Sequence, residues 1–196
     1  MKKIEITVEN AQNAYRNASA DGKELLEHLL GKEIFIPKDV KERIKPFDDA
    51  RNELNRMAEG GDETAAIILA DYESNACNIK NPQTLAYMKL AIIAYALNEG
   101  WEPKFTTDEY RYYPWFSLYT QNEIYEMDEE EKGRVLGRSY NNANAYAGVA
   151  YSNTNFASTN SHTNYGGRLC FKTRELAEYA GKQFLAIYAD FMMFTK

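Results

Sequence analysis

The chain has 196 residues, of which 44% are hydrophobic and 13% aromatic, and its formal net charge is −6 at pH 7. This length suits one domain with a sizeable core and a helical appendage, and the composition excludes a disordered protein. The negative charge excludes broad binding to phosphate backbones, which requires clustered Lys and Arg, so we expect no nucleic-acid partner.

The N-terminal sequence MKKIEITVENAQ has basic residues but no apolar run behind them, so it does not fit a secretory signal. No stretch of the sequence approaches the ~18 apolar residues of a membrane span. The two cysteines, Cys77 and Cys170, belong to no C-x-x-C motif, which fits a reducing compartment. We therefore expect a cytoplasmic protein without a membrane span.

The first hundred residues are predicted to be mainly helical, because apolar residues recur at helical spacing between capping and turn residues. The expected helices cover 9–18, 21–30, 47–57, 64–72 and 83–98, and a short β-like piece covers 33–37. The helix 83–98 has only a narrow polar face and should be buried between other elements. The pair Gly60-Gly61 marks a turn, which divides the chain into a helical N-terminal region, 1–60, and a second domain, 61–196.

After Trp101, Pro, Gly and aromatic residues interrupt the helical spacing, and short alternating runs replace it. We expect strands at 111–119, 134–140, 147–151 and 168–171. Pro114 restricts the first of these strands to an edge or a bulge. Helices followed by short antiparallel strands predict an α+β fold.

A closing helix is predicted within 173–196, because aromatic and aliphatic residues recur at helical spacing from 174 to 194. We expect its aromatic stripe to pack on the sheet, as such stripes usually do. The alternative is an exposed apolar tail, 191–194, that docks a neighbouring subunit or a virion component.

The segment 140–165 carries no formal charge and is rich in Asn, Tyr, Ser, Thr and Ala. Adaptable hydrogen-bonding groups and rigid amphipathic rings are typical of recognition surfaces. The same composition also describes structural hairpins and turns, in which Asn, Gly and Ser supply the turn conformations.

Two sequence elements frame this segment. The residues concerned are Arg134, Val135, Arg138, Ser139, Tyr140, Asn141 and Asn142 in the first element and Asn164, Gly166, Gly167, Arg168 and Leu169 in the last. They resemble the R-V-x-R-G-G-S-W-N-N and N-x-G-F-R-L strands that close proteins of the C-type-lectin and formylglycine-generating-enzyme superfamily. The resemblance implies a C-type-lectin-like domain in which strand 134–140 lies close to strand 168–171 and the loops diversify on buried strands.

Three phrases carry a second resemblance: ALNEGWEP at 96–103, YYPWF at 112–116 and GGRLCFKTRELAEYAGKQF at 166–184. They are similar to uncharacterised proteins carried by phages and mobile elements of anaerobic gut bacteria. This resemblance implies no established activity. It implies a phage-associated protein, in the host-cell cytoplasm or on the virion, with a variable binding face on a constant frame.

Catalytic and cofactor-binding patterns are scarce in the sequence. Of the two histidines, His28 falls on a leucine-rich helix, where a surface or partly buried role is expected, and His162 has no carboxylate nearby in sequence to orient its ring. Formylglycine-generating enzymes work through a cysteine pair, whereas only Cys170 occurs in the terminal region here. There is no phosphate-binding glycine loop and no metal-ligand spacing, and we interpret the acidic run 126–132 as a solvated loop rather than a cation site. We therefore expect no enzymatic activity, no metal and no cofactor.

The function expected from these features is non-enzymatic ligand binding through the face 140–165. Aromatic rings would stack on a sugar or an apolar partner surface, and amides would supply uncharged donors and acceptors. The predicted ligand-binding residues are Asn142, Asn144, Tyr146, Tyr151, Asn153, Asn155, Phe156, Asn160, His162 and Asn164. The ligand would be a protein or a glycan that the sequence does not identify.

Two alternatives come from other functional classes. In a structural virion protein, the same face would be an interface between subunits, including those of a homo-oligomer. In an intracellular antagonist of host defence, it would bind a host protein or a small signalling molecule.

Overall fold

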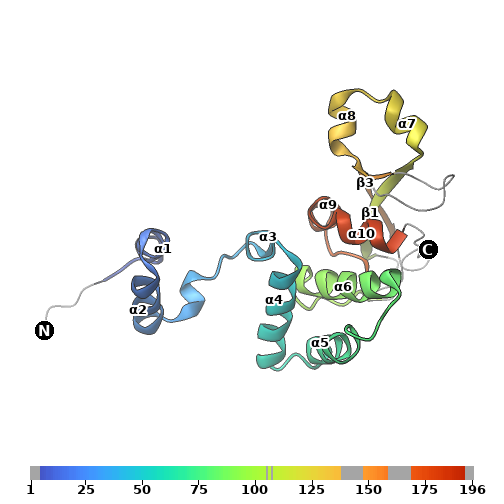
Figure 1. The fold of residues 1–196 in the computed structure, drawn as a ribbon. Helices are drawn as coiled ribbons and strands as arrows, with labels where there is room; N and C mark the ends of the chain where they lie inside the picture. The colour runs from blue at the N-terminus through green and yellow to red at the C-terminus, as the bar shows by residue number, and fades with distance from the viewer. Residues whose placement is uncertain (1–4, 105, 107, 138–147, 159–168, 193–196) are drawn as a thin grey trace, which may run out of the picture. The chain divides into compact units, whose positions relative to one another are not determined.

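The computed structural model describes residues 5–104, 106, 108–137, 148–158 and 169–192 (Figure 1). The chain divides into two compact units, Met1–Arg43 and Ile44–Lys196. Helices and a small antiparallel sheet coexist, so the predicted α+β class is confirmed. The division expected at 60/61 lies inside the second of these units.

The first unit is helical. Its elements are α1 (Val8–Asn17), α2 (Ala20–Leu30), the 3-10 helix η1 (Lys32–Phe35) and α3 (Val40–Arg43). Thr7 and Ser19 begin α1 and α2 by accepting hydrogen bonds from backbone N–H groups of the first turn. The β-like piece expected at 33–37 is wrong, because most of it forms η1. The ring of Phe35 stacks on Tyr15 with a centroid distance of 4.3 Å, and this contact with α1 stabilises the turn.

The second unit begins with a layer of three helices. They are α4 (Phe47–Glu59), α5 (Glu63–Asn75) and α6 (Pro82–Leu97). Asp62 and Asn81 cap α5 and α6, and Pro82 occupies the first turn of α6, where its missing N–H has no helical partner to lose. Helix α6 lies between α4, α5 and the C-terminal helix α10 (Leu185–Met192), which confirms its predicted burial (Figure 1).

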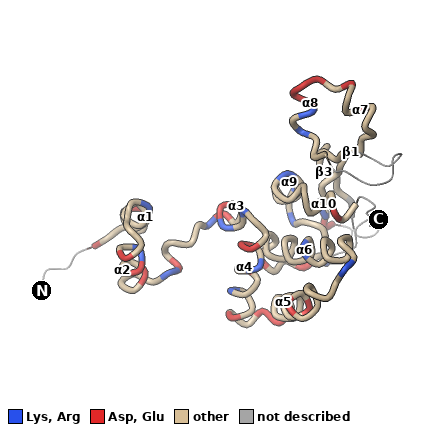
Figure 2. Tube along the Cα trace, in the orientation of Figure 1, with Lys and Arg blue, Asp and Glu red and all other residues tan. Residues whose placement is uncertain are grey.

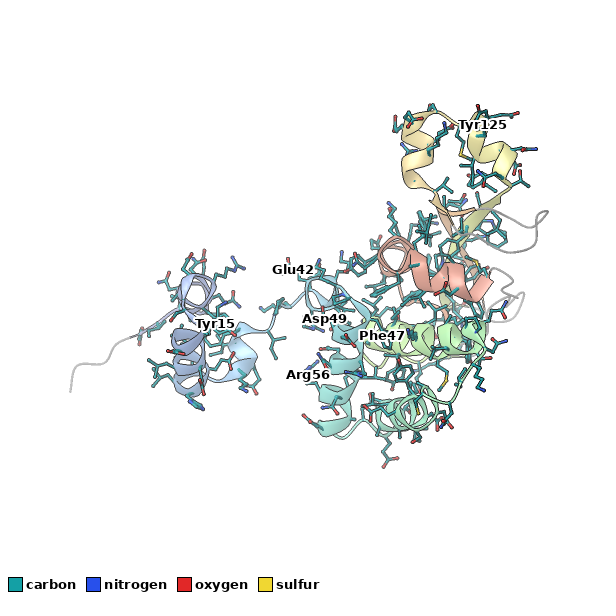
Figure 3. All side chains as sticks on the ribbon, viewed as in Figure 1. Tyr15, Glu42, Phe47, Asp49, Arg56 and Tyr125 are labelled. Atoms are coloured by element: carbon teal, nitrogen blue, oxygen red, sulfur yellow. The ribbon has the colours of Figure 1, made fainter. Side chains whose placement is uncertain are left out.

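The contacts of helix α4 with α5 and α6 assign it to this layer. Phe47, labelled in Figure 3, meets the ring of Tyr72 on α5 edge-on, with a centroid distance of 5.4 Å. The ammonium group of Lys89 on α6 lies over the same Phe47 ring. Leu54 and Ala50 of α4 are fully buried. Burial of this apolar face explains why the second unit begins before α4 rather than at Gly60-Gly61.

The sheet has three antiparallel strands in the order β1-β3-β2. Their bounds are Tyr110–Tyr119 for β1, Leu136–Gly137 for β2 and Gly148–Ser158 for β3. On the other edge of β1, Tyr112 and Phe171 exchange two backbone hydrogen bonds of 3.0 and 2.7 Å. Both Leu169 and Phe171 are buried, as expected.

The expected proximity of strands 134–140 and 168–171 is wrong for the residues that the structure describes. Of the first of them, the structure describes only 134–137, where Arg134 ends helix α8 (Glu129–Arg134) and β2 follows. β2 pairs with β3, whereas Phe171 bridges the far side of β1. Two strands therefore separate the two elements.

The solvated loop expected for the acidic run 126–132 is wrong, because the run contains the end of one short helix and most of α8. Helix α7 (Gln121–Glu126) begins with a capping box between Thr120 and Glu123, and α8 begins with one between Asp128 and Glu131. The hydrogen bond from the Thr120 N–H lowers the pKa of Glu123 below its ordinary value. Figure 2 shows the acidic residues gathered on α8, where carboxylates near the N-terminus favour the helix.

The closing segment forms two helices, α9 (Arg174–Gln183) and α10, instead of one. Phe184 leaves helical geometry between them, with φ −110° and ψ 27°. This break lets α9 pack on β1 and β3 while α10 packs on α6. Phe191 contacts Tyr87 on α6, and Met192 packs against the cluster around Val149, so these two residues of the tail pack inside the unit.

Candidate functional site

The structure describes four of the ten predicted ligand-binding residues, all of them on β3. They are Tyr151, Asn153, Asn155 and Phe156. The other six lie outside the described residues: Asn142, Asn144, Tyr146, Asn160, His162 and Asn164. The site can therefore be built only from β3 and its neighbour β1.

A β-bulge divides the four described residues between the two faces of the sheet. Asn153 lies opposite Trp115, but the next pair in the register joins Tyr151 to Phe116, so Ser152 is the extra residue. Without the bulge, alternation would place Tyr151 and Asn153 on one face. With it, Tyr151 and Phe156 share one face, and Asn153 and Asn155 share the other.

Tyr151 lies between the sheet and α9. A Cβ atom added to Gly181 of α9 would come within 2.7 Å of the Tyr151 ring. The ammonium group of Lys182 lies 5.3 Å from the centroid of that ring, and the Tyr151 hydroxyl is 2.8 Å from the hydroxyl of Thr154. Tyr151 is half-buried in these contacts and helps to hold α9 on the sheet.

Phe156 belongs to an aromatic cluster near one end of the same face. Its ring is 47% exposed and meets the 50% exposed ring of Tyr110 edge-on, with a centroid distance of 5.2 Å. The guanidinium of Arg174 lies 6.0 Å from the centroid of Phe156 and donates a hydrogen bond to the carbonyl oxygen of Thr154. The cluster therefore combines apolar area with a positive charge.

The opposite face presents an exposed tryptophan among uncharged polar groups. Trp115 is 42% exposed, and the exposed residues Ser152, Asn153 and Asn155 lie across from it and beside it on β3. We call these four residues the Trp115 patch. None of them carries a formal charge. Trp115 is not among the predicted ligand-binding residues, although the YYPWF phrase contains it, because its cross-strand partner depends on the register and the bulge.

Cys170 has the properties of a core residue. It is buried, and burial raises the pKa of its thiol to about 11 in spite of the nearby positive charge of Arg111. The reactive thiolate is therefore scarce at neutral pH. Across the part of the chain that the structure describes, no three His, Cys, Asp or Glu side chains lie close enough together to hold a metal ion.

No family model matches this chain, and neither a curated protein nor a solved structure matches it significantly. The two resemblances to known groups therefore stay predictions from the sequence. Among the described helices, none is both long and apolar enough to cross a membrane. Support for a function consequently comes from the geometry of the sheet.

Proposed function

We propose that this protein is a non-enzymatic binding protein that recognises a glycan through the Trp115 patch. The observation that carries the proposal is the exposed indole of Trp115, which lies beside Asn153 and Asn155 on a packed strand pair. A flat aromatic ring stacks on the apolar face of a sugar, and its few rotors make the entropic cost of binding low. Asparagine amides both donate to and accept from sugar hydroxyls.

The strand pair gives the patch a rigid support. On the face opposite Trp115, α9 packs on both strands through Gly181, and the rings of Phe116 and Tyr188 lie 4.8 Å apart, which joins β1 to α10. Side chains on such a frame are held in place before the ligand arrives, which reduces the cost of ordering them.

The association with phages is a further part of the proposal, and the sequence resemblance is its support. A virion location would bring the Trp115 patch to glycans of the host surface. If the patch instead recognised a protein, the same stacking and amide contacts would apply, and the experiment below distinguishes the two.

The experiment is a glycan array followed by calorimetry on the best ligand, with the wild type, Trp115→Ala and Tyr125→Ala. Tyr125 is 83% exposed on α7 (Figure 3), which makes it a matched exposed aromatic residue outside the patch. We expect Trp115→Ala to lose about 2 kcal/mol of binding free energy, or about thirtyfold in affinity. Tyr125→Ala should bind as the wild type does.

Salt provides a second readout. Stacking and neutral hydrogen bonds depend little on ionic strength, so the affinity of the wild type should survive a moderate rise in salt. A steep loss of affinity with salt, or equal affinity in Trp115→Ala, would place the binding site elsewhere. Binding of no glycan together with Trp115-dependent binding of a purified protein would show that the ligand class is wrong.

A further inference from the structure

A groove runs between α5 and α6 on the helical layer of the second unit, apart from the sheet. It consists of two adjoining hollows of about 200 and 220 Å³. Ile68 of α5 and Ala91 of α6 line both of them, so the hollows meet at these two apolar residues, and we refer to the pair of hollows as the α5–α6 groove. Nothing in the proposed glycan recognition uses it.

Aromatic rings flank both ends of the groove. At one end, the hollow is lined by Trp101 and by Tyr95 of α6. At the other end, it is lined by Tyr87, also on α6. Aromatic faces attract cations through the negative potential above the ring.

A carboxylate also lies at each end. Glu102 lines the hollow beside Trp101, and Asp71 lines the hollow beside Tyr87. Within the described residues, neither has an ion-pair partner, and no Lys or Arg is among the lining residues of either hollow. Figure 2 shows acidic positions on α5 and no basic one. The groove therefore carries a negative charge at each end, and none of its described lining residues neutralises either charge.

A third carboxylate, that of Asp62, holds the ring of Tyr95 in place. Asp62 caps α5 through the N–H of Ala65 and also accepts a hydrogen bond from the hydroxyl of Tyr95, at 3.0 and 3.1 Å to its two oxygens. Tyr95 is thus held across the start of α5, beside Thr64. Because these contacts occupy Asp62, the free carboxylates of Glu102 and Asp71 are the groups available to a ligand.

We propose that the α5–α6 groove binds a linear aliphatic polyamine. Thr64 and Asp71, which line different hollows, are separated by about 10 Å along α5 at the helical rise per residue. An extended triamine places its terminal ammonium groups at a similar separation, so that one can meet Glu102 and the rings at its end while the other meets Asp71 and Tyr87. The methylene segments between the ammonium groups cover the apolar floor at Ile68 and Ala91, and the central ammonium group faces water on the open side of the groove. The net charge of −6 further attracts a polycation.

The test measures binding of spermidine by the fluorescence of Trp101. The chain has two tryptophans, so the full-length Trp115→Phe variant leaves Trp101 as the single reporter. We expect a saturable change with spermidine, weaker binding of hexylamine, which has one ammonium group, and no binding of the uncharged octanediol. Affinity for spermidine should fall as salt rises, because two charge contacts contribute to it.

Two charge-removing substitutions locate the site. Glu102→Gln and Asp71→Asn, each made in the reporter chain, should weaken spermidine binding at least about fivefold, because each removes one charge contact at the protein surface. The matched control is Glu73→Gln, which removes an exposed carboxylate from α5 outside the groove and should leave the affinity unchanged. Circular dichroism verifies that every variant is folded.

Several results would overturn the proposal. They are the absence of any saturable signal with millimolar spermidine, equal binding of octanediol, and equal affinity in the two groove variants and the control. Tighter binding of a single-lysine peptide than of spermidine would assign the groove to a lysine side chain of a partner and would reject a free polyamine. All these outcomes are independent of glycan binding, because Trp115 is not part of the groove.

Discussion

Gly181 permits a close approach between α9 and the sheet. An added Cβ would lie 2.6 Å from Pro114 and 2.7 Å from the ring of Tyr151, which is closer than packed carbon atoms tolerate. We expect Gly181→Ala to lower the free energy of unfolding by about 1–3 kcal/mol through overpacking, in spite of the better helix propensity of Ala. Chemical denaturation measures the effect.

Gly133 is the matched control for this substitution. It lies in α8, and no atom lies within 4 Å of an added Cβ. Gly133→Ala should therefore leave stability unchanged or raise it by up to ~1 kcal/mol, because Ala favours the helix. Equal effects of the two substitutions would contradict the close packing of α9 on β1 and β3.

The raised pKa of Tyr95 predicts that the stability of the fold depends on pH in the alkaline range. Burial, followed by the hydrogen bond to Asp62, raises the pKa of Tyr95 from its ordinary value of 10.0 to about 12. The folded protein therefore holds the phenolic proton more tightly than the unfolded chain does. This contribution to stability is complete below pH 10 and is lost as the pH rises to about 12.

The measurement compares urea denaturation of the wild type and Tyr95→Phe at several pH values. The difference in unfolding free energy should be largest near neutral pH and should shrink above pH 10, because Phe lacks the proton. A difference that stays constant up to pH 12 would show that the pKa of Tyr95 is not raised.

At the scale of elements, the strand pair divides into buried and exposed positions. Phe171 is fully buried and bridges β1, so Phe171→Ala should cost about 3–5 kcal/mol of unfolding free energy. Asn153→Ala and Asn155→Ala should change it by no more than ~0.5 kcal/mol, because both side chains are exposed on β3. The division would be contradicted if thermal unfolding showed a larger loss of stability in Asn153→Ala or Asn155→Ala than in Phe171→Ala.

At the scale of the whole molecule, the boundary between the two units is testable with fragments. The fragment 44–196 retains α4 and the hydrogen bonds from Tyr179 and Gln183 to the carbonyl oxygens of Ile44 and Lys45. We expect it to unfold cooperatively at nearly the melting temperature of the full chain. The fragment 61–196 lacks α4 and should lose at least ~3 kcal/mol, because it exposes the surface that Phe47 and Leu54 cover. Equal stability of the two fragments would contradict the assignment of α4 to the second unit.

Features that depend on neighbouring residues along the chain were determined by the sequence. Capping residues such as Asp62 and Asn81 mark helix starts, since their side chains accept hydrogen bonds from the first turn. The nearly continuous apolar surface of α6 indicated its burial, and the change of pattern after Trp101 indicated the α+β class. The sequence also drew attention to the polar and aromatic segment 140–165, in which only 147–151 was expected to be a strand, and four of its predicted ligand-binding residues lie on β3.

Features that depend on distant partners were decided only by the tertiary structure. The segment 33–37 has β-like composition, yet without a strand partner it forms a 3-10 turn against Tyr15. The bulge at Ser152 separates Tyr151 from Asn153, and the register places Trp115 beside the asparagines. Likewise, Glu102 and Asp71 are far apart in sequence, yet both line the α5–α6 groove. The physical reason is that strand register, helix packing and cavity shape depend on non-local contacts, which local periodicity and capping patterns do not encode.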